Sequence, residues 1–224
     1  MCGRMAIVIR ETEIAARLKA FVEMNVLIVP PQPGTIPTGP SYNVAPSAQI
    51  PIVMETPRGI EIDTYRWGLI PSWAKDDSMA NKCFNARSET MAEKPTFRSS
   101  FKKSRCVIPI GGYYEWQKRT DNTKQPMFIH GTENDLLFLA GLCEPSTRSA
   151  TVITREARGP LKEIHDRQPI ALNHEEVMEW LNPQNEPYVL QLLIESADNP
   201  LGAYNVSTAV NSVRNNTPAL LTPI

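Results

Sequence analysis

Short apolar runs separated by turn residues are the sequence feature that most limits the fold of this chain. These runs are rich in Val, Ile, Phe and Tyr, which favour strands, and glycine, proline, asparagine or aspartate stands between them. Six of them lie at residues 49–55, 60–70, 105–116, 125–130, 135–145 and 150–156. We therefore expect an α+β protein in which a mixed, barrel-like or sandwich-like β core carries a few flanking helices. A chain of 224 residues is long enough to form a single domain of this kind over 1–224.

Helical spacing is confined to a few segments. Residues 11–25 place apolar side chains on one helical face. A later helix is predicted to begin after Asn173, the N-cap, with Glu176 in the reciprocal capping position and Pro183 as the stop. Residues 186–196 form a second late helical segment. The proline-rich stretch 29–46, in contrast, predicts a long ordered loop without regular structure.

Charge and hydropathy exclude several classes of protein. The formal net charge is −1, and no apolar run approaches the roughly 18 residues that a membrane helix needs. The N-terminal MAIVI run is too short for the apolar core of a signal peptide. We expect a cytoplasmic protein without a membrane partner, nucleoid-associated in a bacterium and nuclear in a eukaryote. A basic surface is still predicted locally, because residues 98–105 hold four basic side chains and no acidic one.

Cysteine and histidine spacing argues against a metal site. The four cysteines and three histidines form no C-x-x-C, H-x-x-x-H or H-E-x-x-H motif. Without a secretion signal, the thiols are expected to be reduced. We therefore expect no metal and no cofactor.

The position of Cys2 directly after Met1 suggests a reactive group. Chain ends are usually frayed and dispensable, so a terminal cysteine has no obvious core to fill. Removal of Met1 would leave a free α-amine and a thiol on the same residue. This 1,2-aminothiol can attack an aldehyde and then close a five-membered ring.

Five further stretches occur in order along the chain: MCGR at the start, SYNVAPS at 41–47, RWGLIPSWAKD running on to FNARSET at 66–90, CVIPIGGYYEWQ at 106–117 and EIHDRQPIAL at 163–172. With the terminal VNSVRNNTPALLTPI, they resemble the SOS response-associated peptidase (SRAP) family over almost the whole chain. Ser41 stands where the family pattern has a basic residue before Tyr42.

The resemblance implies a sensor of abasic sites in single-stranded DNA that forms a thiazolidine with the abasic sugar. It implies that Cys2 is the cross-linking residue and that Asn85 and Arg87 hold the sugar and a phosphate. It also implies proton-handling roles for Glu115 and His165 and a phosphate contact for Arg167. The expected partner is single-stranded DNA containing an abasic site, bound by a monomer.

Elementary chemistry reaches the same reaction from the residues. An amine adds to the open-chain aldehyde of the sugar to give an imine, and the adjacent thiol then traps it in an effectively unimolecular step. A lysine would stop at the imine, from which β-elimination cuts the strand. His165 has an ordinary pKa near neutrality and suits opening of the sugar ring. Aromatic surroundings would raise the pKa of Glu115 and fit it for general acid–base work. Asn85 can donate to a sugar oxygen.

Further residues are candidates for binding the strand. Arginine forks onto phosphate, which suggests Arg4, Arg87 and Arg167 as phosphate ligands. Trp67, Trp73 and Phe97 can stack on bases, and Arg98 can add to a basic face. The alternative is that the two tryptophans belong to the core or the wall of a cleft, and that Arg98 only aids solubility.

Two other functions remain open from the sequence. One is an N-terminal-nucleophile cysteine amidohydrolase or peptidase, including cleavage after Met1 by Cys2 with His165 and Glu115. The other is a non-covalent single-strand-binding module, which predicts salt-sensitive binding without a covalent product.

Overall fold

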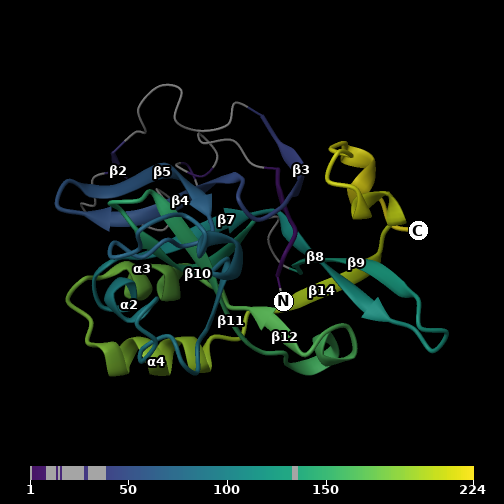
Figure 1. Cartoon of the computed structure of the whole chain (residues 1–224). Helices are drawn as coiled ribbons and strands as arrows, with labels where there is room; N and C mark the ends of the chain where they lie inside the picture. Colours follow the sequence, from purple (N-terminus) through teal and green to yellow (C-terminus); the bar gives the residue numbers. More distant parts are fainter. Residues whose placement is uncertain (1, 9–13, 15, 17–27, 30–38, 133–135) are drawn as a thin grey trace.

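The computed structural model describes residues 2–8, 14, 16, 28–29, 39–132 and 136–224. The predicted helix 11–25 and most of the proline-rich stretch lie outside these residues, apart from isolated positions. The described part of the chain is mostly β-sheet with few helices, as the strand-like runs predicted (Figure 1).

Two sheets form the β core. The five-stranded sheet has the order β14-β9-β8-β1-β3, and the nine-stranded sheet has the order β12-β11-β10-β7-β4-β5-β2, with β13 and β6 attached to β10 and β11. The strands of the first sheet are β1 (Met5–Ile7), β3 (Ser41–Val44), β8 (Gly112–Lys118), β9 (Lys124–Gly131) and β14 (Leu201–Asn205). Those of the second are β2 (Ile28–Val29), β4 (Gln49–Thr56), β5 (Gly59–Trp67), β6 (Asn85–Arg87), β7 (Arg105–Ile110), β10 (Leu137–Glu144), β11 (Ser149–Glu156), β12 (Arg167–Pro169) and β13 (Ala171–Leu172).

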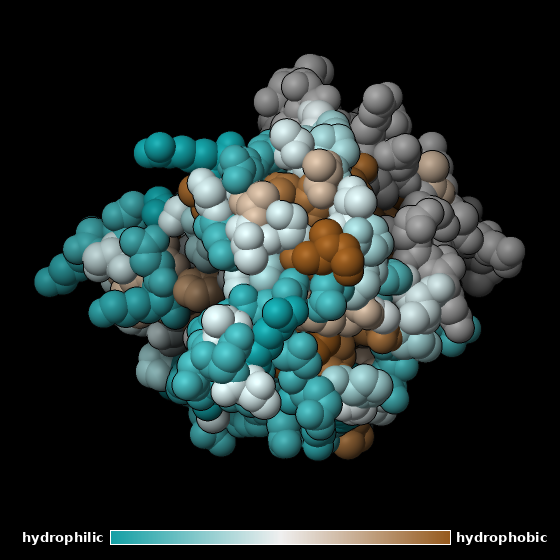
Figure 2. All heavy atoms as spheres, turned by 90° about the vertical axis from the view of Figure 1, so that its right-hand side faces the viewer, coloured by the Kyte–Doolittle hydropathy of each residue, from teal (hydrophilic) through white to brown (hydrophobic). Residues whose placement is uncertain are grey.

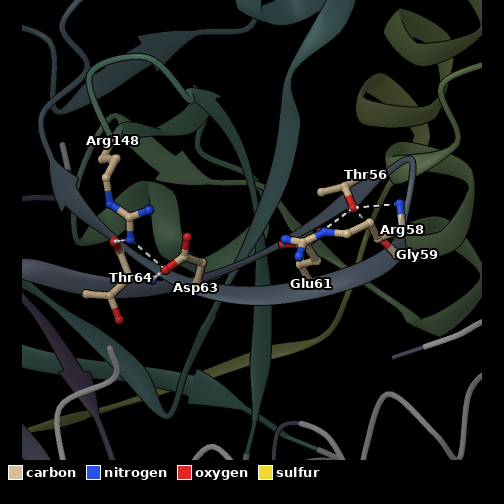
Figure 3. Close-up of polar contacts among 7 residues, drawn as sticks. All are labelled: Thr56, Arg58, Gly59, Glu61, Asp63, Thr64 and Arg148. Atoms are coloured by element: carbon tan, nitrogen blue, oxygen red, sulfur yellow. Dashed lines mark hydrogen bonds and ion pairs between the residues drawn. The ribbon is translucent and has the colours of Figure 1, made fainter. Parts of the chain in front are cut away.

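The larger sheet curls into a ring without closing as a barrel. Strand β5 pairs along its length with β4, and its last residues also pair in parallel with the start of β11. Figure 3 shows a polar contact that supports this join: Arg148, just before β11, donates to the Asp63 carboxylate on β5 at 2.6 Å. Near the start of β5, Arg58 in the preceding turn forks onto Glu61 at 3.0 and 2.9 Å, close to the turn that joins β4 to β5. The ring therefore has a defined seam where β5 meets β11.

Helices cover one face of the larger sheet. They are α2 (Arg98–Lys103), α3 (His174–Leu181) and α4 (Pro187–Ser196), with short 3₁₀ turns η1 (Ala80–Lys82), η2 (Gly159–Glu163), η3 (Thr208–Asn211) and η4 (Pro218–Leu221). The predicted capping box of α3 is confirmed, because the Asn173 side chain accepts from the Glu176 N–H and the Glu176 carboxylate accepts from the Asn173 N–H. Under these helices, Trp180 and Phe101 pack in one hydrophobic core cluster. Among the described residues, no helix has the length and apolarity needed to cross a membrane.

The sequence-based assignment of strands is confirmed at all six runs, with one division. The run 105–116 is two strands, β7 and β8, that separate at Gly111. A side chain at Gly111 would collide with the side chain of Val8, so glycine permits the close approach of β1 at this corner. The prediction that the proline-rich stretch lacks regular structure is wrong at residues 41–44, since β3 contains no proline and pairs with β1. Strands β6, β12 and β13 are too short to stand out as apolar runs.

Candidate active site

Cys2 packs in a hydrophobic core cluster that contains residues of both sheets, among them Tyr113 on β8 and Trp67 on β5. It directly precedes β1, the strand that pairs with both β8 and β3 and places Met5 opposite Tyr113. The Cys2 side chain is fully buried in the second core cluster, which also contains Trp67 and Tyr113. Burial, and secondarily the negative charge of Glu115, raises the pKa of the Cys2 thiol well above its ordinary value. The thiol is therefore protonated at neutral pH, and the expectation that a terminal cysteine has no core to fill is wrong here.

Asn85 reaches this site from the other sheet. Strand β6 pairs in parallel with β11, which sets Asn85 beside Val152 and Arg87 beside Thr154. The Asn85 Nδ2 donates to the backbone carbonyl of Cys2 at 2.7 Å. Its Oδ1 is buried and has no hydrogen-bond partner among the described residues. Asn85 thus holds the Cys2 backbone with its donor and offers an acceptor to the site, whereas a donor to the sugar was expected.

Glu115 faces Cys2 because of the alternation along β8. Tyr113 and Glu115 share one face, while Tyr114 and Trp116 pack in a different core cluster on the other. Glu115 is 4% exposed, and burial raises its pKa from 4.5 to about 7. The prediction of a raised pKa is confirmed, although only one of its aromatic sequence neighbours shares its face. A carboxyl with this pKa exchanges protons readily in both directions near neutral pH.

His165 approaches from the turn after η2. Its Nδ1 lies 2.9 Å from the backbone nitrogen of Arg167 and 2.8 Å from Oδ1 of Asp166, and these two contacts require opposite hydrogen positions. Burial is the main reason that the pKa of His165 is lowered. The side chain of Asp166, whose charge acts in the opposite direction, is 83% exposed. We therefore assign a neutral ring in which Nδ1 accepts from the Arg167 N–H and Nε2 carries the proton.

Two of the predicted phosphate-binding arginines line one cavity. The cavity has a volume of about 490 Å³, and its lining includes Arg87, Arg167, Lys162 and Asp166. Arg87 is exposed, whereas Arg167 donates to both carboxylate oxygens of Glu89 at 2.6 and 2.9 Å. A phosphate would therefore bind Arg87 without competition from a carboxylate in the described structure. At Arg167 it would compete with Glu89 for the guanidinium.

Arg4 is partly buried beside β3. Its Nη1 donates to Asn43 Oδ1 at 2.6 Å and to the Val210 carbonyl at 2.7 Å. Its guanidinium also lies over the Trp116 ring, 5.7 Å from the centroid. These contacts orient Arg4, and both hydrogen bonds use Nη1.

The structure separates the predicted base-stacking residues. Trp67 is fully buried, and its indole N–H donates to the Phe84 carbonyl at 2.9 Å. Phe97 is 7% exposed in the core under the helices. Neither exposes a ring face in this structure, which favours the alternative of a core role for Trp67. Trp73, in contrast, is 58% exposed, and Arg98 is exposed at the start of α2. Their roles stay predictions.

Tyr113 lies in the site but is not among the residues predicted from the sequence. It is almost fully buried, and burial raises its pKa, with further contributions from Cys2 and Glu115. The signal was present, because Tyr113 stands two positions before Glu115 on a strand and must share its face. Its ring contributes to the dry wall around the thiol.

The site brings together a buried cysteine thiol, a buried carboxyl with a raised pKa and a histidine, near a cavity whose lining has three basic and three acidic residues. It is built from the start of β1, from β6 and β8, and from the turn before β12. In the described part of the chain, no group of three or more His, Cys, Asp or Glu residues is arranged to hold a metal ion. The four cysteines are free thiols. Such an arrangement can add a nucleophile to a carbonyl carbon and manage the protons of each step.

The family model described as SOS response associated peptidase (SRAP) matches residues 1–213. The chain belongs to this family. A relative named abasic site processing protein YoqW, from Bacillus subtilis, is 41% identical over 191 residues, covering 81% of this chain and 85% of its own. Abasic site processing protein HMCES from Gallus gallus is 35% identical, covering 83% of this chain and 66% of its own. Abasic site processing protein YedK from Escherichia coli is 28% identical over the full length of both chains.

Solved structures agree with the fold. A protein from Bacteroides thetaiotaomicron superposes with a TM-score of 0.77 at 23% identity and covers all of both chains. A phage-related protein from Bordetella bronchiseptica superposes with a TM-score of 0.69 at 23% identity, covering 92% of this chain and 95% of its own. The SRAP fold is therefore shared at low sequence identity.

Proposed function

We propose that this chain processes abasic sites in single-stranded DNA by covalent capture through Cys2. The observation that carries the proposal is the contact of buried Cys2 with Asn85 and Glu115, together with a cavity lined by Arg87, Arg167 and Asp166, the residue next to the half-buried His165. The names of the relatives support DNA damage as the setting.

The reaction balances without a cofactor. After Met1 is removed, the α-amine of Cys2 adds to the aldehyde carbon of the open sugar, and the resulting carbinolamine loses one water to give an imine. The thiol then adds across the carbon–nitrogen double bond, its proton passes to nitrogen, and a thiazolidine results. While Met1 is attached, the Cys2 nitrogen is an amide and cannot react in this way.

Glu115 suits the proton transfers at nitrogen and sulfur. The α-ammonium must lose a proton before attack, and the buried thiol must lose one as the ring closes. A carboxylate with a pKa of about 7 can accept these protons and return them when the ring opens again. The same residue thus serves cross-linking and its reversal.

His165 suits opening of the closed sugar. The tautomer assigned above carries its proton on Nε2, because Nδ1 accepts from the Arg167 backbone. Nε2–H can donate to the ring oxygen as the hemiacetal opens. The Asn85 Oδ1 can accept a sugar hydroxyl, while Arg87 and Arg167 bind flanking phosphates and Trp73 stacks on a base.

The decisive experiment uses mature protein and an oligonucleotide with one abasic site. We expect a denaturation-resistant adduct whose intact mass is that of protein plus DNA less one water. Single-stranded DNA should react faster than intact duplex, because exposing the sugar in a duplex costs a few kcal/mol of unstacking. Binding without an adduct would indicate the non-covalent module. Turnover of glutamine or a peptide without an adduct would indicate the hydrolase.

His165→Ala should slow adduct formation about 100-fold on the natural closed sugar, because ring opening loses its acid. An open-chain aldehyde substrate should restore most of the rate. Single-turnover cross-linking with both substrates measures the effect. His130→Ala is the matched control, since His130 lies on β9 and its Nδ1 contacts only the Gly131 carbonyl among the polar groups described. A wild-type rate from His165→Ala on the closed sugar would remove His165 from this step.

A further inference from the structure

The C-terminal segment 207–216 is bound to strand β3 by asparagine side chains. Asn43 is 6% exposed, and its Nδ2 lies within hydrogen-bond distance of the carbonyls of Val210, Ser212 and Asn215 at 3.2, 2.9 and 2.8 Å. In Figure 1 this segment, coloured yellow, lies beside β3. Figure 2 faces this side of the molecule, and its surface is mostly hydrophilic with small hydrophobic areas. Two motifs far apart in the sequence therefore form one unit.

This unit converges on Arg4. The Oδ1 of Asn43 and the Val210 carbonyl both accept from the same nitrogen, Nη1, of Arg4. The Trp116 ring, over which the guanidinium lies, is itself held by Asn211, whose Oδ1 accepts from the indole N–H at 2.7 Å. Arg4 is thus held both by polar partners and by a ring that the same segment fixes.

The described hydrogen bonds of Arg4 use only one of its three guanidinium nitrogens. Arginine has five N–H donors, and both described acceptors use Nη1. In the part of the chain that the structure describes, the buried Nε has no hydrogen-bond partner. The Arg4 carbonyl also accepts from the Tyr114 N–H at 2.9 Å, so the backbone of Arg4 is fixed beside the strand that carries Glu115.

We propose that Asn43 is a positioning residue: together with the C-terminal segment, it holds Arg4 in the orientation that receives the phosphodiester beside the abasic sugar. This inference rests on the proposed function. Arg4 is two residues from Cys2, so a phosphate fixed at Arg4 would place the sugar at a set distance from the nucleophile. A free arginine side chain would instead lose rotamer entropy on binding.

A double-mutant cycle on binding tests the proposal. The probe is single-stranded DNA with a tetrahydrofuran abasic analogue, which has no aldehyde and cannot cross-link. Loss of one phosphate contact on a single strand lowers the slope of log K against log salt by about 0.7. We expect this loss for Arg4→Ala, a similar loss for Asn43→Ala, and no further loss for the double variant. Additive losses, or an unchanged slope for Asn43→Ala, would overturn the proposal.

The control for general loosening is Asn216→Ala. Asn216 Oδ1 accepts from the Tyr42 N–H at 2.6 Å, so it ties the same segment to the same strand without contacting Arg4 in any described hydrogen bond. This variant should lower the denaturation midpoint and keep the wild-type salt slope. A slope reduced as much as in Asn43→Ala would show a structural role only. Asn43→Ser, too short to reach Arg4, should reproduce the alanine result if Asn43→Ala folds poorly.

A parallel cross-linking experiment distinguishes failure of this proposal from failure of the proposed function. Wild-type protein is mixed with the reactive abasic substrate. If the wild type forms an adduct but the Asn43 variants keep the wild-type salt slope, only the role of Asn43 is overturned. Absence of an adduct overturns the proposed function, whatever the slopes are.

Discussion

Cys2→Ala is expected to abolish the thiazolidine adduct completely. The variant keeps an α-amine after Met1 removal and can still form an imine, but it has no thiol to trap it. The imine should therefore be captured only by a reductant such as borohydride, and without a reductant it should lead to β-elimination and a cut strand. Intact mass and denaturing electrophoresis distinguish these products.

The structure sets the controls for this variant. Because Cys2 is fully buried, its truncation leaves a small cavity and costs about 1–2 kcal/mol of unfolding free energy, more than an exposed terminal residue would. Cys83→Ala is the matched variant, since Cys83 is also a buried free thiol but lies in the core under the helices. It should form the adduct at the wild-type rate. A stable adduct formed by the Cys2→Ala variant without added reductant would exclude the thiazolidine mechanism.

Glu115→Gln should slow both cross-linking and reversal by about 10²–10⁴-fold, the usual value of general acid–base assistance. Glutamine keeps the shape of the side chain and cannot exchange the proton. An open-chain aldehyde should not rescue this variant, in contrast to His165→Ala. In the wild type, cross-linking should rise with pH through about 7 as Glu115 becomes a base, and reversal should fall over the same range. Both inflections should disappear in Glu115→Gln.

The same substitution has an opposite effect on stability. Burial raises the pKa of Glu115 from 4.5 to about 7, so the folded state favours the protonated form. The stability that this group contributes is complete below pH 4.5 and is lost as the pH rises through 7. Glu115→Gln should therefore have the free energy of unfolding of the wild type in acid. Above pH 7 its free energy of unfolding should exceed that of the wild type by about 3 kcal/mol at most, so it should unfold at a higher urea concentration. Urea titrations at both pH values, with Glu144→Gln as control, measure this difference. Equal stability at pH 8 would show that Glu115 is not held in its protonated form by the fold.

Much of the fold was predictable because strand signals are local. Alternating or continuous apolar runs mark β4, β5, β7, β9, β10 and β11, and the capping pattern at Asn173 marks α3. Strand β6 has only three residues, and its existence depends on pairing with β11, which no local pattern reveals. The pairing of β5 with β11, which curls the sheet into a ring, is non-local for the same reason.

The site was predictable in its chemistry and less so in its environment. Residue types and motif order indicated Cys2, Glu115 and His165, and alternation along a strand indicates which neighbours share the face of Glu115. Burial of individual aromatic residues depends on tertiary packing. Trp67 therefore belongs to the core and Trp73 to the surface, although they stand only six positions apart in the sequence.

The pairing of β1 between β8 and β3 affects the order of events during synthesis. The first residues to leave the ribosome pair with β8, at 112–118, and Arg4 binds a carbonyl at Val210. The N-terminus of a nascent chain therefore waits for about half of the protein before it can be enclosed, and for nearly all of it before Arg4 is fixed. An aminopeptidase working at the ribosome has this interval to remove Met1 while the end of the chain is still accessible. The reactive amine would thus be produced before the pocket that encloses it exists.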